Sequence, residues 1–197
     1  MGFQLIAMAV LAAFYGCYVV KMICQKKKGI QTDQIGKGKA GFVKLIEVTM
    51  KISAFLVLGA GIISIVLDAS DSPMAIRIIG VVVSAAGTAV FITAVLTMRD
   101  SWRAGVSPTD KTELVTSGIY QFSRNPAFLG FDLLYIGILL MFFNWGVCVV
   151  SVFAILMYHL QIVYVEEAFL LATFGDEYLH YKKRACRYIG IGNGYGL

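Results

Sequence analysis

The sequence GIYQFSRNPAFLG, residues 118–130, separates the longest polar interval of the C-terminal half from an apolar run. Pro126 has no N–H group and suits the first position of a helix. Asn125 is biased toward extended backbone by the proline that follows it. The stretch therefore predicts a polar loop, with Tyr120 and Arg124 as its prominent side chains, held at the mouth of an apolar helix.

The composition indicates an integral membrane protein. Of the 197 residues, 58% are hydrophobic and 15% are charged, whereas a soluble domain carries about a quarter charged residues. Mean hydropathy is +0.76, and the apolar residues come in long runs. The net charge of +5 fits basic cytoplasmic loops and anionic lipid headgroups, so nucleic acid is not an expected partner. The four cysteines have no metal-ligand spacing, and no metal site is expected.

Apolar segments predict an all-α, polytopic membrane bundle of five transmembrane helices, forming one domain over residues 1–197. These segments cover about residues 3–23, 43–67, 76–98, 127–143 and 146–165. The second is expected to carry Lys44, Glu47 and Lys51 on wet first turns. The third contains small residues that let helices approach closely, namely Gly80, Ser84, Ala85, Ala86, Gly87 and Ala89.

Lysine and arginine set the predicted orientation. The polar segments after the first, third and fifth apolar segments hold seven, four and four of the 17 Lys and Arg residues. With five spans these three segments fall on one side, which the positive-inside rule makes cytoplasmic. We therefore expect the N-terminus outside, the C-terminus inside, and a cytoplasmic helical tail. The loop that ends at Pro126 and the tail that starts at Glu166 then meet at one membrane surface.

Two motifs at that surface carry a family resemblance. LVTSGIYQFSRNPAFLG at residues 114–130 is followed, after a predicted helical hairpin, by EEAFLLATFGDEYLHYKKR at residues 166–184. This pairing of G-x-Y-x-x-x-R-[HN]-P with E-E-x-x-L-x-x-x-F-G-x-x-Y-x-x-Y resembles the isoprenylcysteine carboxyl methyltransferases and their phospholipid N-methyltransferase relatives. Members of that family are integral membrane enzymes that use S-adenosyl-L-methionine. The first three apolar segments match the family only as generic membrane helices.

The resemblance implies a cofactor pocket built from about residues 112–130 and 164–187. Asn125 stands where many members have histidine, and Phe128 where tyrosine is commoner. One carboxylate of the Glu166–Glu167 pair is expected to contact the cofactor. Aromatic faces and carboxylates suit its sulfonium cation, and Arg124 suits its carboxylate. The implied cofactor-binding residues are Thr112, Leu114, Val115, Gly118, Tyr120, Asn125, Pro126, Phe128, Glu166 and Glu167.

The implied reaction is in-line transfer of a methyl group from sulfur to a carboxylate or amine of a lipid or other lipophilic small molecule. Positioning and exclusion of water would supply most of the catalysis, with Arg124, Glu166 and Glu167 as candidate catalytic residues. An amine acceptor needs a base, and Asp132 and His159 are further candidates on the acceptor side. Prenylcysteine-specific members carry an arginine shortly before the Glu pair, which this sequence lacks, so the acceptor stays open, as does the oligomeric state.

Simpler interpretations stand beside these assignments. Asp132 and His159 lie inside apolar segments and could be hydrogen-bonded structural residues. Arg124 could anchor the loop to membrane lipids, and Glu166 and Glu167 could merely end a helix. For the whole protein, the alternatives are a non-catalytic lipid-binding scaffold and a small transporter. A transporter is expected to show internal repeats or charges near the membrane midplane, and the sequence shows no clear repeat.

Overall fold

The computed structural model of the chain describes residues 1–106 and 113–190, and the regular structure in these residues is helical. No β-strand forms among them, which confirms the all-α prediction for this part of the chain. The α-helices are α1 (Gly2–Lys27), α2 (Gly41–Val66), α3 (Met74–Met98), α4 (Pro126–Met141), α5 (Trp145–Gln161) and α6 (Glu167–Arg184). Short helical turns are η1 (Arg99–Ser101) and η2 (Gly118–Gln121), and a π-helical segment, η3 (Ile162–Glu166), joins α5 to α6.

The helices coincide with the five expected apolar segments apart from a few residues at their ends. Among the described residues, α1, α2, α3 and the long helix that begins at Trp145 are long and apolar enough to cross a membrane. α4 is also apolar but has only 16 residues, or about 24 Å at the rise of an α-helix. The chain is therefore a multi-pass helical membrane protein.

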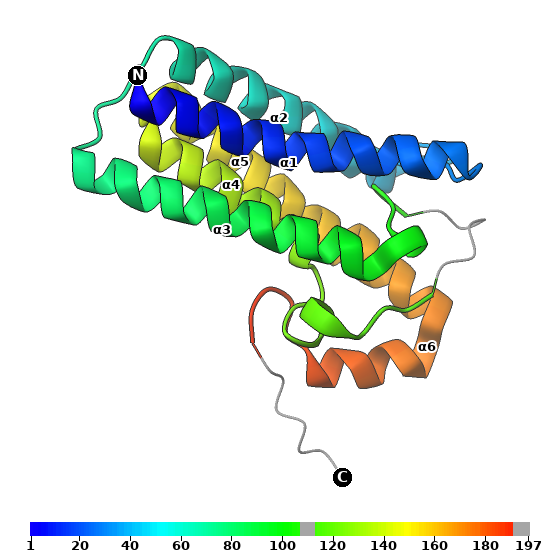
Figure 1. Cartoon of the computed structure of the whole chain (residues 1–197). Coiled ribbons are helices and arrows are strands. Elements are labelled where there is room, and N and C mark those ends of the chain that lie inside the picture. The colour runs from blue at the N-terminus through cyan, green and yellow to red at the C-terminus, as the bar shows by residue number, and fades with distance from the viewer. Residues whose placement is uncertain (107–112, 191–197) are drawn as a thin grey trace.

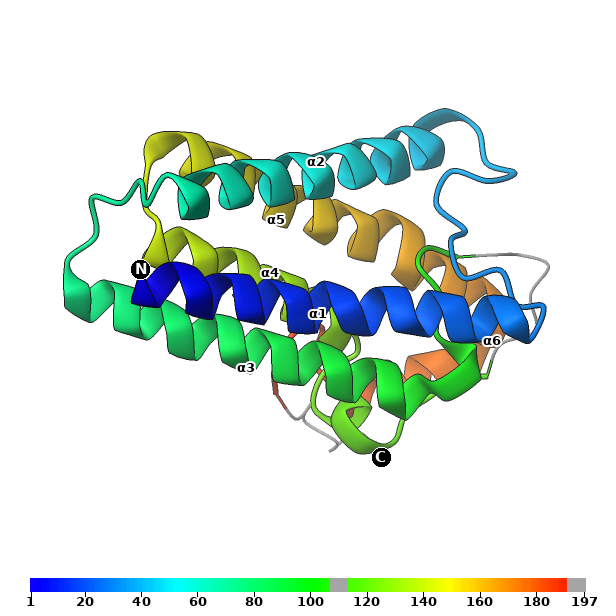
Figure 2. The ribbon, with the colours of Figure 1, turned by 45° about the horizontal axis from the view of Figure 1, so that its top comes forward.

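Figure 1 shows α1 to α5 side by side in an elongated bundle, with α6 turned across one end. The segment between α1 and α2, the segment after α3 and the tail all lie at that end, as Figure 2 also shows. The α2–α3 connection and the α4–α5 hairpin lie at the opposite end. Asn144 begins α5 there by accepting a hydrogen bond from Val147 N at 3.0 Å. The three polar segments that carry most of the basic residues thus gather at one end of the bundle.

Small residues bring α3 and α4 into close contact. A Cβ atom added to Gly137 would lie 2.5 Å from Ser84 N, and one added to Gly87 would lie 2.8 Å from Gly130 O. Only glycine leaves room for backbones at this separation. The close approach predicted for the third apolar segment is therefore confirmed, and it fixes α4, whose first residues belong to the functional stretch.

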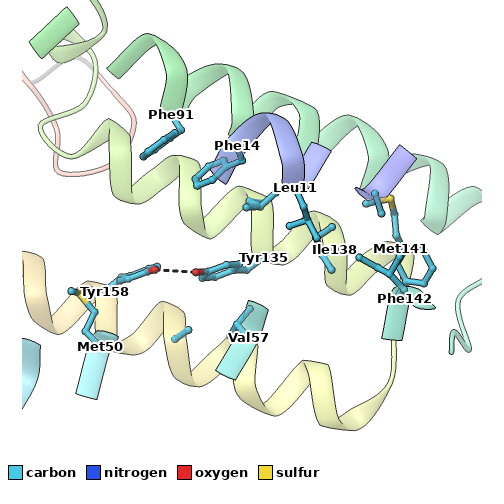
Figure 3. Packing of buried hydrophobic residues seen from close by; sticks show 14 of the residues in the cluster. Leu11, Phe14, Met50, Val57, Phe91, Tyr135, Ile138, Met141, Phe142 and Tyr158 are labelled. Carbon is cyan, nitrogen blue, oxygen red and sulfur yellow. Dashed lines mark hydrogen bonds between the residues drawn. The ribbon is translucent and has the colours of Figure 1, made fainter. Parts of the chain in front are cut away.

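The core between the helices is aromatic (Figure 3). Phe14 of α1 stacks on Phe91 of α3 with ring centroids 4.2 Å apart. Tyr135 of α4 and Tyr158 of α5 share a hydrogen bond of 3.0 Å between their hydroxyl groups, drawn as a dashed line in Figure 3. These two buried hydroxyl groups therefore each have a hydrogen-bond partner, which an apolar environment requires.

Candidate functional site

The tail holds the loop of residues 118–125 against the bundle. Gly118 opens the η2 turn, and the loop then runs to Asn125, directly before α4. The hydroxyl of Tyr181 in α6 donates to Tyr120 O at 2.6 Å. Tyr178, one turn earlier, is buried on the same face, as the spacing of the two tyrosines predicts. Two segments far apart in sequence therefore form one unit at the end of the bundle.

An ion cluster, here called the arginine clamp, completes this unit with the buried Arg124 and Glu167 and the half-buried Arg187. Arg124 donates to Glu167 Oε1 at 2.7 Å and also to the carbonyl oxygen of Ala185. Arg187 donates two hydrogen bonds to the same carboxylate, at 2.9 and 3.0 Å. Paired hydrogen bonds between guanidinium and carboxylate groups are strong and directional. The clamp therefore fixes the loop, the start of α6 and the residues after α6 relative to one another.

The charge state of Glu167 follows from the clamp. Burial alone would raise the pKa of its carboxyl group, but hydrogen bonds and positive charges from Arg187 and Arg124 outweigh burial. They lower the pKa of Glu167 to about 2. Glu167 is therefore a carboxylate near neutral pH, and both of its oxygen atoms accept hydrogen bonds from arginine side chains.

The neighbouring Glu166 has a different environment because the helix changes its winding there. The π-helical segment Ile162–Glu166 places Glu166 within 3.1 Å of the Nε2 atom of Gln161, five residues earlier. Such π segments are rare and occur frequently at functional sites. Burial raises the pKa of Glu166 to about 7, against the effect of the hydrogen bond from Gln161. The two adjacent carboxyl groups thus have opposite pKa shifts and point to different surroundings.

Glu166 lines a cavity that we call the loop pocket. Predicted residues Leu114, Val115, Tyr120 and Arg124 lie on its wall, together with Leu170, Phe174 and Tyr181 of the tail. Its enclosed volume is about 100 Å³, but it continues into an open groove along the end of α3. The two share Met98, Ser101, Arg103, Glu113, Leu114 and Val115. The loop pocket therefore combines two carboxyl groups (Glu113 and Glu166), two cations (Arg103 and Arg124) and several aromatic rings beside a solvent-open entrance.

A second cavity, the bundle pocket, lies among the helices and is almost wholly apolar. Its volume is about 300 Å³. Arg103 and Gly105 line both cavities, so the two pockets adjoin. Helices α1, α2, α4 and α5 supply most of its wall, through Tyr15, Tyr18, Val19, Met50, Lys51, Ala54, Phe55, Leu58, Ala127, Phe128, Phe131 and Tyr158.

Of the remaining predicted cofactor-binding residues, those that the structure describes do not line the loop pocket. Phe128 lines the bundle pocket instead. Asn125 is buried beside the clamp, where its Nδ2 atom donates to Arg187 O at 3.1 Å, and Pro126 starts α4 next to it. Thr112 lies outside the described residues.

The two candidate acceptor-side residues, Asp132 and His159, line neither pocket. His159 Nδ1 lies 2.8 Å from the hydroxyl group of Tyr188, which the tail brings alongside α5. Asp132 is buried in α4, and its Oδ1 atom has no hydrogen-bond partner among the described residues.

Some wall residues were not among the predicted site residues. Leu170, Phe174 and Tyr181 are the apolar and aromatic letters of the tail motif, so their spacing was a usable signal. Gly175 is the motif's glycine, and its positive φ of 51° breaks α6 so that both halves reach the loop. Arg103 and Gly105 had no such signal, because only the fold brings them between the two cavities.

These features define a helical membrane protein with a polar, aromatic pocket at one end of the bundle and an adjoining apolar cavity. The sequence profile of the phospholipid methyltransferase family matches residues 75–177, just over half of the chain. The chain belongs to this family.

Individual relatives match a shorter region. A protein-S-isoprenylcysteine O-methyltransferase of Saccharomyces cerevisiae is 34% identical over 79 residues, which is 40% of this chain and 31% of the relative. The corresponding protein of Schizosaccharomyces pombe is 32% identical over 71 residues, 36% and 30% of the two chains. That of Mus musculus is 37% identical over 76 residues, 39% and 27% of the two chains. The match thus spans about a third or less of the length of these relatives.

Proposed function

We propose that this protein transfers a methyl group from S-adenosyl-L-methionine to a carboxylate or amine of a lipophilic acceptor. The observation that carries the proposal is the contact between the loop pocket and the bundle pocket at Arg103 and Gly105. A water-soluble methyl donor and an apolar acceptor need two different cavities that meet at one point. The names of the relatives and of the family support the same class of reaction.

The loop pocket fits the chemistry of the donor. Its sulfonium cation is favoured by a carboxylate and by aromatic faces, which Glu166, Tyr120 and Phe174 provide. Arg124 and Arg103 add positive charge that suits the donor's carboxylate. Ligand pockets are usually larger than the enclosed part of this one, so the donor would extend into the groove beside α3.

The bundle pocket suits the acceptor's hydrocarbon part. Because it lies between helices that face the bilayer, an apolar chain can reach it without crossing water. S-adenosylmethionine supplies the electrophilic methyl group, and the protein's part is to hold both molecules in line and keep water away. Glu166 has a pKa of about 7 and is the carboxyl group best suited to take a proton from an amine acceptor.

The clamp residue Glu167 takes a structural role in this proposal, and Glu166 is the carboxylate at the donor. We place the loop pocket on the cytoplasmic side, following the distribution of Lys and Arg over the polar segments. Membrane lipids would surround the helices and supply or present the acceptor.

Calorimetry with purified protein in detergent tests the proposal. We expect S-adenosylmethionine to bind, and Glu166→Gln to weaken binding at least about tenfold through loss of the carboxylate. Glu177→Gln is the matched control, because Glu177 is exposed on α6 and does not line the pocket. Absence of binding by the wild-type protein would reject the proposal.

Transfer of a labelled methyl group to a lipid extract then separates an enzyme from the alternatives. Labelled lipid that appears only with active protein and donor supports the enzyme. Donor binding without any labelled product would favour a non-catalytic scaffold.

A further inference from the structure

A buried polar chain links the segment between α1 and α2 to the loop pocket. Glu47 of α2 is fully buried, although the sequence led us to expect it on a wet first turn of its helix. That expectation is wrong because residues 28–40 fold back over α2. Gly36 N donates to Glu47 Oε2 at 2.5 Å, and Lys39 forms an ion pair with Glu47 Oε1.

The chain continues through α5. The Nε2 atom of Gln161 lies 3.5 Å from Glu47 Oε1 and 3.1 Å from Glu166 Oε1. An amide nitrogen carries two N–H groups, so Gln161 can donate to both carboxyl groups at once. Because Gln161 is fully buried, water does not compete for these hydrogen bonds.

Stability alone is a weak reason to bury such a pair. A buried ion pair often contributes no more than apolar side chains of similar volume would. Here, however, the pair sits at the end of a chain whose other end is a wall residue of the loop pocket.

We propose that Glu47 is a positioning residue of the donor site: with Lys39 and Gln161, it fixes the side chain of Glu166 at the wall of the loop pocket. This inference rests on the proposed function of that pocket. The same segment also pairs with Ala104, which lies between the wall residues Arg103 and Gly105, since Gln34 N donates to Ala104 O at 2.8 Å and Ala104 N donates to Thr32 O at 3.0 Å. Residues 28–40 are thereby held in place, and they are connected to Glu166 through Glu47 and Gln161.

The direction in which each neighbouring charge shifts the pKa of Glu166 provides a test. The negative charge of Glu47 raises the pKa of Glu166, and the positive charge of Lys39 lowers it. Other groups that act on Glu166 or line its pocket are Arg103, Glu113, Tyr120, Arg124, Gln161 and Tyr181. They are unchanged in the variants below, so their contributions are common to all measurements.

The test measures the affinity for S-adenosylmethionine by calorimetry from about pH 5.5 to about pH 9, on both sides of the expected midpoint. In the wild type, affinity should rise as Glu166 loses its proton near pH 7. Glu47→Gln should move the midpoint to lower pH by about one unit, and Lys39→Gln should move it to higher pH. A merely structural role would change stability or affinity without opposite shifts of the midpoint.

Asp33→Asn is the matched control, because Asp33 lies in the same segment but accepts from Lys51 and Ile35 N instead. It should keep the wild-type midpoint. Identical midpoints in all variants, or shifts of Glu47→Gln and Lys39→Gln in one direction, would overturn the inference while leaving donor binding intact. If Glu47→Gln does not fold, the upward shift in Lys39→Gln decides alone. Wild-type protein that binds no donor at any pH would reject both the proposed function and this inference.

Discussion

Arg124 and Glu167 are 43 residues apart in the sequence, yet their side chains meet at 2.7 Å, each less than a tenth exposed. The contact joins the residue before Asn125-Pro126 to the first residue of α6. It lies behind the loop pocket and sets the distance between the loop and the tail. The clamp therefore holds the wall of the pocket in place. Its charged side chains can be buried because they are paired with one another.

Removing the charge of Glu167 should therefore destabilise the protein strongly. In Glu167→Gln, Arg124 would stay buried without its counter-charge, and we expect a loss of roughly 3–5 kcal/mol. Thermal unfolding in detergent would show this as a lower Tm. The control is Lys182→Gln: Lys182 lies 3.5 Å from the same carboxylate but is 46% exposed, so its removal should cost at most about 1 kcal/mol. Equal Tm values for the two variants would contradict the prediction.

The contribution of Glu167 should also depend on pH. Its pKa is about 2 in the folded protein, whereas a glutamate in an unfolded chain has a pKa of about 4.3. A lowered pKa stabilises the folded state above the unfolded value, and this stabilisation is lost as the pH falls toward 2. The Tm difference between wild type and Glu167→Gln should be constant from neutral pH to about pH 5 and shrink below that. A difference that stays constant down to pH 3 would argue against the clamp.

The contact between α3 and α4 should not tolerate a methyl group. In Gly137→Ala, the new Cβ would lie 2.5 Å from Ser84 N, so the backbones must separate, at a cost of about 1–3 kcal/mol. Gly59→Ala is the control, because no atom lies within 4 Å of its added Cβ. Alanine favours helix over glycine, so this control should be neutral or slightly more stable. Unfolding by heat, followed by circular dichroism, would compare the two.

Filling the bundle pocket should separate acceptor binding from donor binding. Ala54→Phe places a ring in the cavity, and we expect methyl transfer to fall at least about tenfold because the acceptor is displaced. Donor affinity should stay at the wild-type value. Leu56→Phe, on the same helix but 52% exposed on its outer face, is the control and should leave both properties unchanged. Loss of donor affinity in Ala54→Phe would show that the two cavities do not act separately.

The helices and their close packing could be predicted because each depends on local composition. Apolar runs fix the positions of α1 to α5, and the glycines of α3 indicate a close neighbour. The motifs also pointed to Leu114, Val115, Tyr120 and Glu166, which the fold brings to one cavity.

The different surroundings of Glu166 and Glu167 could not be predicted. They depend on the change of helical winding that follows α5. They also depend on hydrogen bonds from Gln161 to Glu166 and from Arg187 to Glu167, which local sequence patterns do not indicate. The burial of Glu47 likewise depends on the path of residues 28–40, which contain no periodic pattern. Long-range polar pairing of this kind leaves little trace in a single sequence.

The π-helical segment has a consequence for how this region can vary. A π turn amounts to one extra residue inserted in an α-helix, and it offsets the faces of α5 and α6. Deleting one residue between Ile162 and Val165 would let this segment return to α-helical winding, with Glu166 still about one turn after Gln161 and Glu167 still on the next face. An alignment that places a one-residue gap here therefore pairs each glutamate with its counterpart. The π turn absorbs the extra residue locally, so this segment can differ in length by one residue without exchanging the two carboxyl groups.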